Sequence, residues 1–130
     1  MKESALKAYL IAKPEAFEDY PFGPDVCVFK VRGRMFALLS SDAGQLQLNL
    51  KCDPDEAVQL RDVFPAISPG YHMNKRHWNT LVMDGSIPQG EVKRMIDNSY
   101  ALVVKGLNKA ERNRLEIQYG RDALYGAERS

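Results

Sequence analysis

The chain has 130 residues, 45% of them hydrophobic, which is enough for one hydrophobic core but hardly for two. Its 18 basic and 17 acidic side chains leave a net charge of +1, so any surface that binds DNA, RNA or an acidic membrane must be local. The sequence contains neither the ~18-residue apolar run of a membrane span nor the apolar block of a signal peptide. We therefore expect a cytoplasmic, monomeric protein without membrane contact, in which Cys27 and Cys52 are free thiols that pack in the core.

The first 25 residues predict a helix followed by a loop. Apolar residues repeat at helical spacing over residues 4–12, and Pro14 sets the end of this helix. Residues 14–25 contain three prolines and one glycine, which interrupt helices and strands alike, together with three aromatic side chains. We expect this segment to be a loop that folds back onto the core.

Three strands are predicted next. The runs 26–31 and 35–40 are rich in β-forming residues, and Arg32-Gly33-Arg34 between them suits the tight turn of a hairpin. Over residues 45–51, leucines alternate with polar residues. This period of two predicts a strand with one face toward the core and the other toward water.

Start signals mark further helices. Asp53-Pro54-Asp55-Glu56 is typical of an N-cap acid, a proline in the first turn and a capping box. Ser86-Ile87-Pro88-Gln89 is a second candidate capping box, and a long helix is predicted from there to Gly106. Asn108 can cap one further short helix.

Two strands are predicted between those helices, a short one at Ile67 and a longer one over 78–83. The order α-β-β-β-α-β-β-α predicts an α+β fold, an antiparallel sheet with helices packed on it. We expect a single domain over residues 1–118, and a flexible C-terminal tail over 119–130, where no periodicity is left.

Residues 70–80 concentrate side chains that suit nucleic-acid binding. Lysine and arginine neutralise phosphates, asparagine can pair with adenine, and tyrosine, histidine and tryptophan can stack on bases. The hairpin tip adds a second basic patch. The candidate nucleic-acid-binding residues are Arg32, Arg34, Tyr71, His72, Asn74, Lys75, Arg76, His77, Trp78 and Asn79.

A structural interpretation of the same residues stays open. In it the aromatic side chains pack in the core, the asparagines hold a turn, and the cations are solvated. A metal site is not indicated, because His72 and His77 lack the further ligands that metals require at complementary spacing. No activated nucleophile accompanies these histidines, so we expect no enzyme, no metal and no cofactor.

Four motifs in this chain resemble those of the MmcQ/YjbR family of small bacterial proteins. They are Tyr20-Pro21-Phe22-Gly23, residues 48–54, residues 69–80, and Asp84-Gly85-Ser86, and the resemblance covers about residues 1–115. The resemblance implies a CyaY-like α/β fold with a double-wing arrangement, and by analogy of fold it implies DNA binding. The candidate wings would then be the regions around Arg32–Arg34 and Tyr71–Trp78. It assigns no catalytic residue.

Our leading hypothesis is therefore a non-enzymatic DNA-binding protein. Lys75, Arg76 and the hairpin cations would contact phosphates, and the aromatic residues with Asn79 would lie near bases or sugars. The alternative is a protein-interaction or small-ligand module, in which Tyr71, Met73 and Trp78 form an amphipathic patch.

Overall fold

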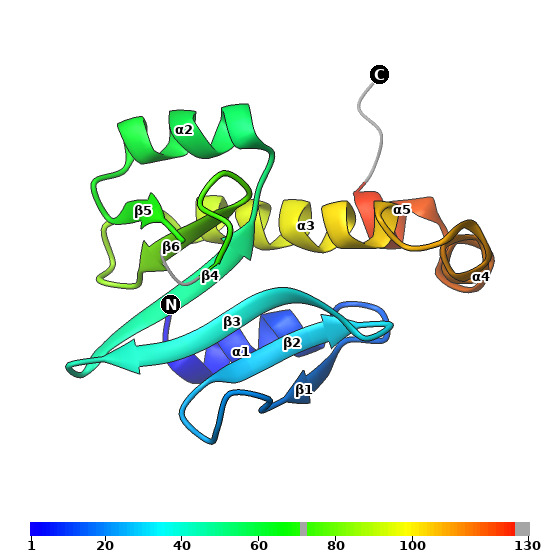
Figure 1. The fold of residues 1–130 in the computed structure, drawn as a ribbon, viewed down its shortest axis with the longest axis horizontal. Coiled ribbons are helices and arrows are strands. Elements are labelled where there is room, and N and C mark those ends of the chain that lie inside the picture. Colours follow the sequence, from blue (N-terminus) through cyan, green and yellow to red (C-terminus); the bar gives the residue numbers. More distant parts are fainter. Residues whose placement is uncertain (71–72, 127–130) are drawn as a thin grey trace.

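The computed structural model describes residues 1–70 and 73–126, which form one six-stranded sheet and five helices (Figure 1). In chain order the elements are α1 (Glu3–Ile11), β1 (Phe17–Asp19), β2 (Cys27–Val31), β3 (Arg34–Asp42), β4 (Gln45–Lys51), α2 (Pro54–Val63), β5 (Ile67–Pro69), β6 (Trp78–Val82), α3 (Gln89–Lys105), α4 (Lys109–Tyr119) and α5 (Arg121–Tyr125).

The sheet has the strand order β1-β2-β3-β4-β6-β5, and each neighbouring pair is antiparallel. In Figure 1, α1 and α3 lie behind the strands, so the face of β2 and β3 toward the viewer carries no helix. The α+β fold with an antiparallel sheet is confirmed. Within the described residues, no helix combines the length and hydropathy needed to cross a membrane.

The main core lies between the sheet and the helices. α3 contributes the largest share of it, because its apolar residues recur every three or four positions and face β3 and β4. The Tyr100 ring meets the Phe36 ring edge-on, with 5.2 Å between the centroids, and the Tyr100 hydroxyl donates a 2.7 Å hydrogen bond to the Pro14 carbonyl. Burial of a side chain such as Phe36 contributes roughly 1.5–3 kcal/mol, so this helix fixes the position of the sheet.

The loop prediction for residues 14–25 is wrong in part. Residues 17–19 form the edge strand β1, with Phe17 opposite Lys30 of β2. The aromatic side chains do not fold into the core: Phe17, Tyr20 and Phe22 are 43%, 45% and 60% exposed. A strand of three residues is too short to show a period of two, which is why the sequence pattern did not reveal it.

The predicted C-terminal tail needs a similar correction. Residues 121–125 form α5, and Leu124 is buried in the main core together with Leu115 of α4. This helix of five residues has only one buried position, so its sequence contains no repeating pattern from which the helix could be predicted. Residues 127–130 of the expected tail lie outside the described part of the chain.

One predicted capping pattern is confirmed in part and another is wrong. The Asp53 carboxylate accepts from the backbone N–H groups of Asp55 and Glu56 at 3.2 Å, as expected for an N-cap. Ser86 caps nothing, because α3 begins at Gln89 after Pro88, without a side-chain cap. The expected cap at Asn108 is present, since its side chain accepts from the Glu111 N–H at 2.9 Å.

Candidate nucleic-acid interface

The sheet face opposite α1 and α3 has a hydrophobic cluster of its own. Val28, Leu38 and Trp78 are buried there, in three different strands, and residues of the described helices take no part. Val26, Met35 and Met73 pack around this cluster and are only partly buried. We call this side of the sheet the open face. Its centre is apolar although no helix covers it, which is uncommon for a sheet that only faces water.

The segment from Gly70 to Trp78 returns the chain from β5 to β6. Gly70 is required there, because a Cβ at this position would lie 2.8 Å from the Trp78 Cβ. Further along, the Asn74 side chain accepts from the Arg76 N–H at 3.0 Å, and the Asn74 carbonyl accepts from the His77 N–H at 3.1 Å. These bonds form a tight turn that leaves Asn74, Lys75 and Arg76 exposed, with His77 half-buried.

Arg61 of α2 supports this turn from the side. One nitrogen of its guanidinium, Nη1, donates to the Lys75 carbonyl at 3.2 Å and to the Asn79 Oδ1 at 3.1 Å. The Asn79 side-chain amide in turn donates to the Ala57 carbonyl at 3.4 Å. The turn is therefore tied to α2 through hydrogen bonds that the sequence did not suggest.

Two of the expected contact residues occupy structural positions. Trp78 is 8% exposed and belongs to one buried cluster with Val28 and Leu38, and Asn79 is 2% exposed and bonded to α2. Neither side chain can stack on a base or reach a sugar without unpacking the fold, so we leave both out of the binding surface. This part of the structural interpretation is correct. Tyr71 and His72 lie outside the described residues.

The predicted hairpin is present, but its two arginines differ. Arg32 and Gly33 form the turn between β2 and β3, with φ values of 51° and 79°. The Arg32 Nε lies 3.0 Å from a carboxylate oxygen of Glu15, so most of its charge is compensated. Arg34 is exposed, and within the described residues it forms no ion pair.

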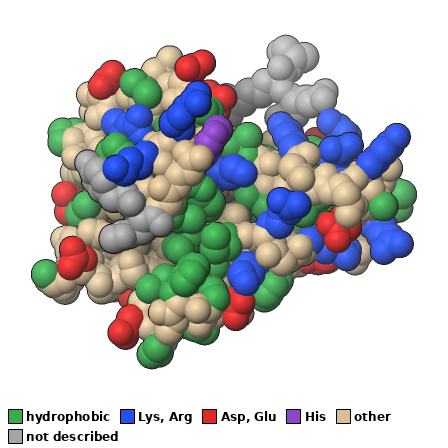
Figure 2. Space-filling model, viewed as in Figure 1, with side chains coloured by type: hydrophobic (Ala, Val, Ile, Leu, Met, Phe, Trp, Pro, Cys, Tyr) green, Lys and Arg blue, Asp and Glu red, His purple; other side chains and the backbone are tan. Residues whose placement is uncertain are grey.

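The strand register brings the remaining cations to one end of the sheet. Arg34 begins β3, Lys51 ends β4 opposite Trp78, and Lys75 and Arg76 precede β6. Since opposite residues of an antiparallel pair share a face, Lys51 lies on the open face beside Trp78. By the same rule Arg34, opposite the main-core residue Val31, stands at this end of the sheet but on the face that the helices cover, so we leave it out of the binding surface. We call Lys51, Lys75 and Arg76 the cationic row. Figure 2, which views the open face, shows hydrophobic side chains in the middle, with lysine and arginine side chains mainly above and to the right of them and acidic side chains along the lower and left edges.

An apolar hollow of about 260 Å³ adjoins the cluster on the open face. Its lining consists of Phe22, Val26, Leu38, Ser40, Asn49 and Met73. Phe22 reaches it from the turn formed by residues 20–23, which is closed by a 3.2 Å bond from the Gly23 N–H to the Tyr20 carbonyl. The Thr80 hydroxyl donates to the Asn49 Oδ1 at 2.6 Å. Sequence reasoning missed Lys51, Asn49 and Phe22, although the alternation of 45–51 had placed the first two on the wet face.

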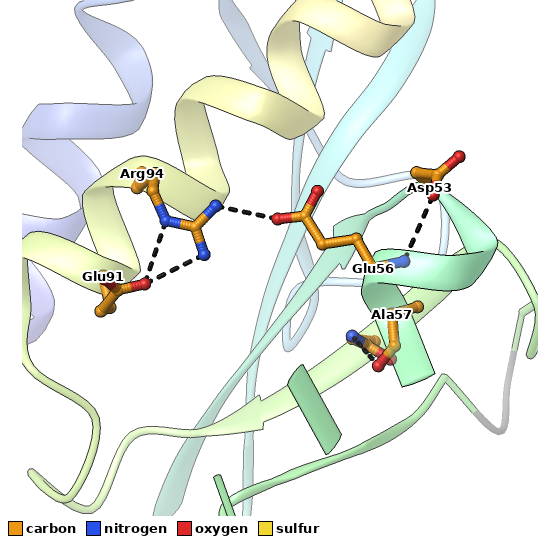
Figure 3. A network of polar contacts seen from close by, with 6 residues as sticks. Asp53, Glu56, Ala57, Glu91 and Arg94 are labelled. Carbon is orange, nitrogen blue, oxygen red and sulfur yellow. Dashed lines mark hydrogen bonds and ion pairs between the residues drawn. The ribbon is translucent and has the colours of Figure 1, made fainter. Parts of the chain in front are cut away.

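The opposite charge gathers elsewhere. A second hollow, of about 510 Å³, lies between the start of α2 and the start of α3, and its carboxylates are those of Asp53, Asp55, Glu56 and Glu91. Figure 3 shows Arg94 between Glu56 and Glu91, at 2.8 and 3.0 Å. These hydrogen bonds, led by that to Glu56, raise the pKa of Arg94. Glu56 thus pairs with Arg94, and no hydrogen bond from its side chain completes the predicted capping box.

The two thiols are buried and unreactive near neutral pH. Burial raises the pKa of Cys52 to about 11 and, as the main cause, raises that of Cys27, so both thiols stay protonated near neutral pH. Both are free and buried, as expected. The part of the chain that the structure describes contains no group of three His, Cys, Asp or Glu residues placed to hold a metal ion.

Comparison with known proteins decides the family. A model of the YjbR family matches residues 11–102. The chain belongs to the YjbR family. It is 40% identical over 96 residues to the uncharacterized protein YbdF of Escherichia coli O157:H7, covering 74% of this chain and 79% of YbdF. It is 31% identical over 115 residues to the uncharacterized protein YjbR of Escherichia coli K12, covering 88% and 98%.

Solved structures agree with this YjbR-family assignment. The crystal structure of Deinococcus radiodurans protein DR2400 superimposes with a TM-score of 0.83 at 37% identity, covering 98% of this chain and 94% of DR2400. A crystal structure of a Pseudomonas syringae protein superimposes with a TM-score of 0.69 at 28% identity, covering 78% and 98%. The family model ends at residue 102, before α4 and α5, and the match to DR2400 covers almost the whole chain.

Proposed function

We propose that this YjbR-family protein binds nucleic acid on the open face, with the cationic row on the phosphates. The observation that carries the proposal is the register, which brings Lys51, Lys75 and Arg76 to one end of a sheet whose open face no described helix covers. Cations at the edge of a binding face fix a polyanion in place and supply most of its sequence-independent affinity.

The distribution of charge supports this proposal despite the net charge of +1. The carboxylates near Arg94 border the hollow between α2 and α3, and those of Glu15 and Asp19 are occupied by Arg32 and Lys30. The phosphate backbone would therefore meet local positive charge at the cationic row. This is the local footprint that the composition requires of a nucleic-acid-binding protein.

The exposure of the side chains on the open face also supports nucleic-acid binding over the alternative, in which Trp78 contacts a protein partner. A hot-spot tryptophan has to reach its partner, and here the side chain is 8% exposed. The partly exposed apolar residues beside it are flanked by the exposed cations Lys75 and Arg76, which a polyanion can use and an apolar peptide cannot. No catalytic role is part of the proposal.

The test is direct binding of fluorescent single-stranded and duplex DNA at low salt, followed by anisotropy across a salt series. A Lys51→Ala/Arg76→Ala variant should bind more weakly, and its salt slope should fall by roughly 0.7–0.9 for each phosphate contact removed. The control is Lys2→Ala/Lys109→Ala, which removes the same charge from exposed residues at the starts of α1 and α4.

The control should bind as the unmodified protein does. If the unmodified protein binds neither form of DNA at low salt, the proposed function is wrong. If both double variants lose affinity equally, the binding is not located at the cationic row.

A further inference from the structure

The apolar hollow on the open face has the features of a small, specific subsite. Its volume of about 260 Å³ lies below the roughly 300–1,000 Å³ of pockets for drug-sized ligands, so its natural occupant is about one ring system. Phe22 lines it and is 60% exposed, so one face of its ring is accessible to a molecule that enters the hollow.

The polar groups of the hollow indicate what this ring system carries. Asn49 and Ser40 stand among the apolar lining residues. The Asn49 Oδ1 accepts a hydrogen bond from the Thr80 hydroxyl, so the Asn49 Nδ2 remains available as a donor. Within the described residues, the Asn49 Nδ2 donates no hydrogen bond. An aliphatic side chain in the hollow would leave this donor unsatisfied, which costs free energy, whereas a ring with a carbonyl oxygen would satisfy it.

The surroundings supply the charge that such a ligand needs. Lys51 lies two residues beyond Asn49 on β4, on the same face, and Lys75 lies two residues beyond Met73. A nucleobase with a carbonyl oxygen, such as thymine, joined to phosphates matches all three features: a flat ring beside Phe22, a carbonyl for Asn49, and an anionic backbone along the cationic row.

We infer that the hollow holds one unpaired nucleobase, stacked on Phe22, so that the protein prefers single-stranded to duplex nucleic acid. This inference rests on the proposed function and specifies its ligand. In a duplex the base is already stacked and paired, and extracting it costs a few kcal/mol. In a single strand the base enters the hollow without that cost, while stacking on an aromatic side chain contributes roughly 1–3 kcal/mol per base.

The experiment compares Phe22→Ala with Phe22→Tyr, using a short oligothymidylate, the same strand with abasic sites, and a duplex of equal length. Because Phe22 is exposed in a turn, neither variant should disturb the fold, and circular dichroism checks this. We expect Phe22→Ala to weaken binding of the single strand roughly 5- to 150-fold, as loss of one stacking contact predicts. Phe22→Tyr should retain it, and duplex binding should hardly change.

Each remaining outcome has one meaning. If single strand, abasic strand and duplex bind alike, and only the Lys51→Ala/Arg76→Ala variant weakens them, the base subsite is wrong and the proposed function stands. If no nucleic acid binds, both are wrong. If the protein is a dimer that Phe22→Ala converts to a monomer, the hollow holds a second copy of the chain, and the inference is overturned.

Discussion

The Ser99 hydroxyl of α3 donates a 2.6 Å hydrogen bond to the carbonyl of Phe36, the residue skipped in the pairing of β2 with β3. The register passes from Phe29–Ala37 to Lys30–Met35, so Phe36 has no partner there. The same Ser99 oxygen accepts from the Lys51 N–H at 2.9 Å. The fully buried Ser99 hydroxyl thus connects β3 and β4 just beyond their last paired residues, at Lys51 of the cationic row.

Replacement of Ser99 by alanine should lower the free energy of unfolding by about 1–3 kcal/mol, because the Phe36 carbonyl and the Lys51 N–H lose a buried partner. Chemical denaturation measures this. Ser4→Ala is the control: Ser4 is exposed within α1, where alanine is the better helix former, so stability should stay equal or rise slightly. Equal stability of the Ser99→Ala protein would show that the bridge contributes nothing.

Gly70→Ala should destabilise the protein by about 1–3 kcal/mol and displace the turn before β6, because the new Cβ would lie 2.8 Å from the Trp78 Cβ and 3.1 Å from its carbonyl oxygen. Thermal unfolding reports the stability. Gly90→Ala is matched to it: this position in the first turn of α3 has no atom within 4 Å of the new Cβ. There the same substitution should be neutral or stabilising by up to about 1 kcal/mol.

The single tryptophan of the chain reports on the open face. Since Trp78 is 8% exposed, its emission should be blue-shifted and poorly quenched by acrylamide. Met73→Ala should increase quenching several-fold, because Met73 packs against the cluster that contains Trp78. Met83→Ala, which removes a half-buried methionine packed on the main core instead, should leave quenching unchanged. Strong quenching of the unmodified protein would contradict the burial of Trp78.

Alkaline pH should weaken the fold in part through Cys52. Burial raises its pKa from 9.0 to about 11, so the folded protein holds the thiol proton more tightly than the unfolded chain does. This contribution is complete below pH 9 and is lost as the pH rises toward 11, by up to about 1.4 kcal/mol per pH unit. Denaturation of Cys52→Ala provides the comparison. The stability difference between the two proteins should shift in favour of Cys52→Ala across this range, and a constant difference would contradict the raised pKa.

The sequence predicted those elements whose signals are periodic or local. The strand predicted from the alternating leucines over 45–51 is confirmed as β4, and the predicted cap at Asp53 is confirmed at the start of α2. The strand β1 and the helix α5 were missed, since each spans too few residues to repeat a pattern. The Ser86 cap failed because Pro88 and Gln89 begin α3 later than the motif suggests.

The candidate site could be predicted only in part for a related reason. Lys75 and Arg76 are exposed because they lie in a local turn, and such a turn can be predicted from its polar residues. The burial of Trp78, and the places of Lys51 and Phe22 beside it, depend on which strands are neighbours in the sheet. No spacing along the chain contains that information.

Both edges of the sheet are poor templates for another strand. β1 has three residues, two of them acidic, and β5 has three residues ending in a proline that lacks an N–H group. Charge, brevity and proline at sheet edges are the means by which proteins avoid edge-to-edge aggregation. The partly apolar face of the sheet can therefore remain uncovered without edge-to-edge association between copies of the protein.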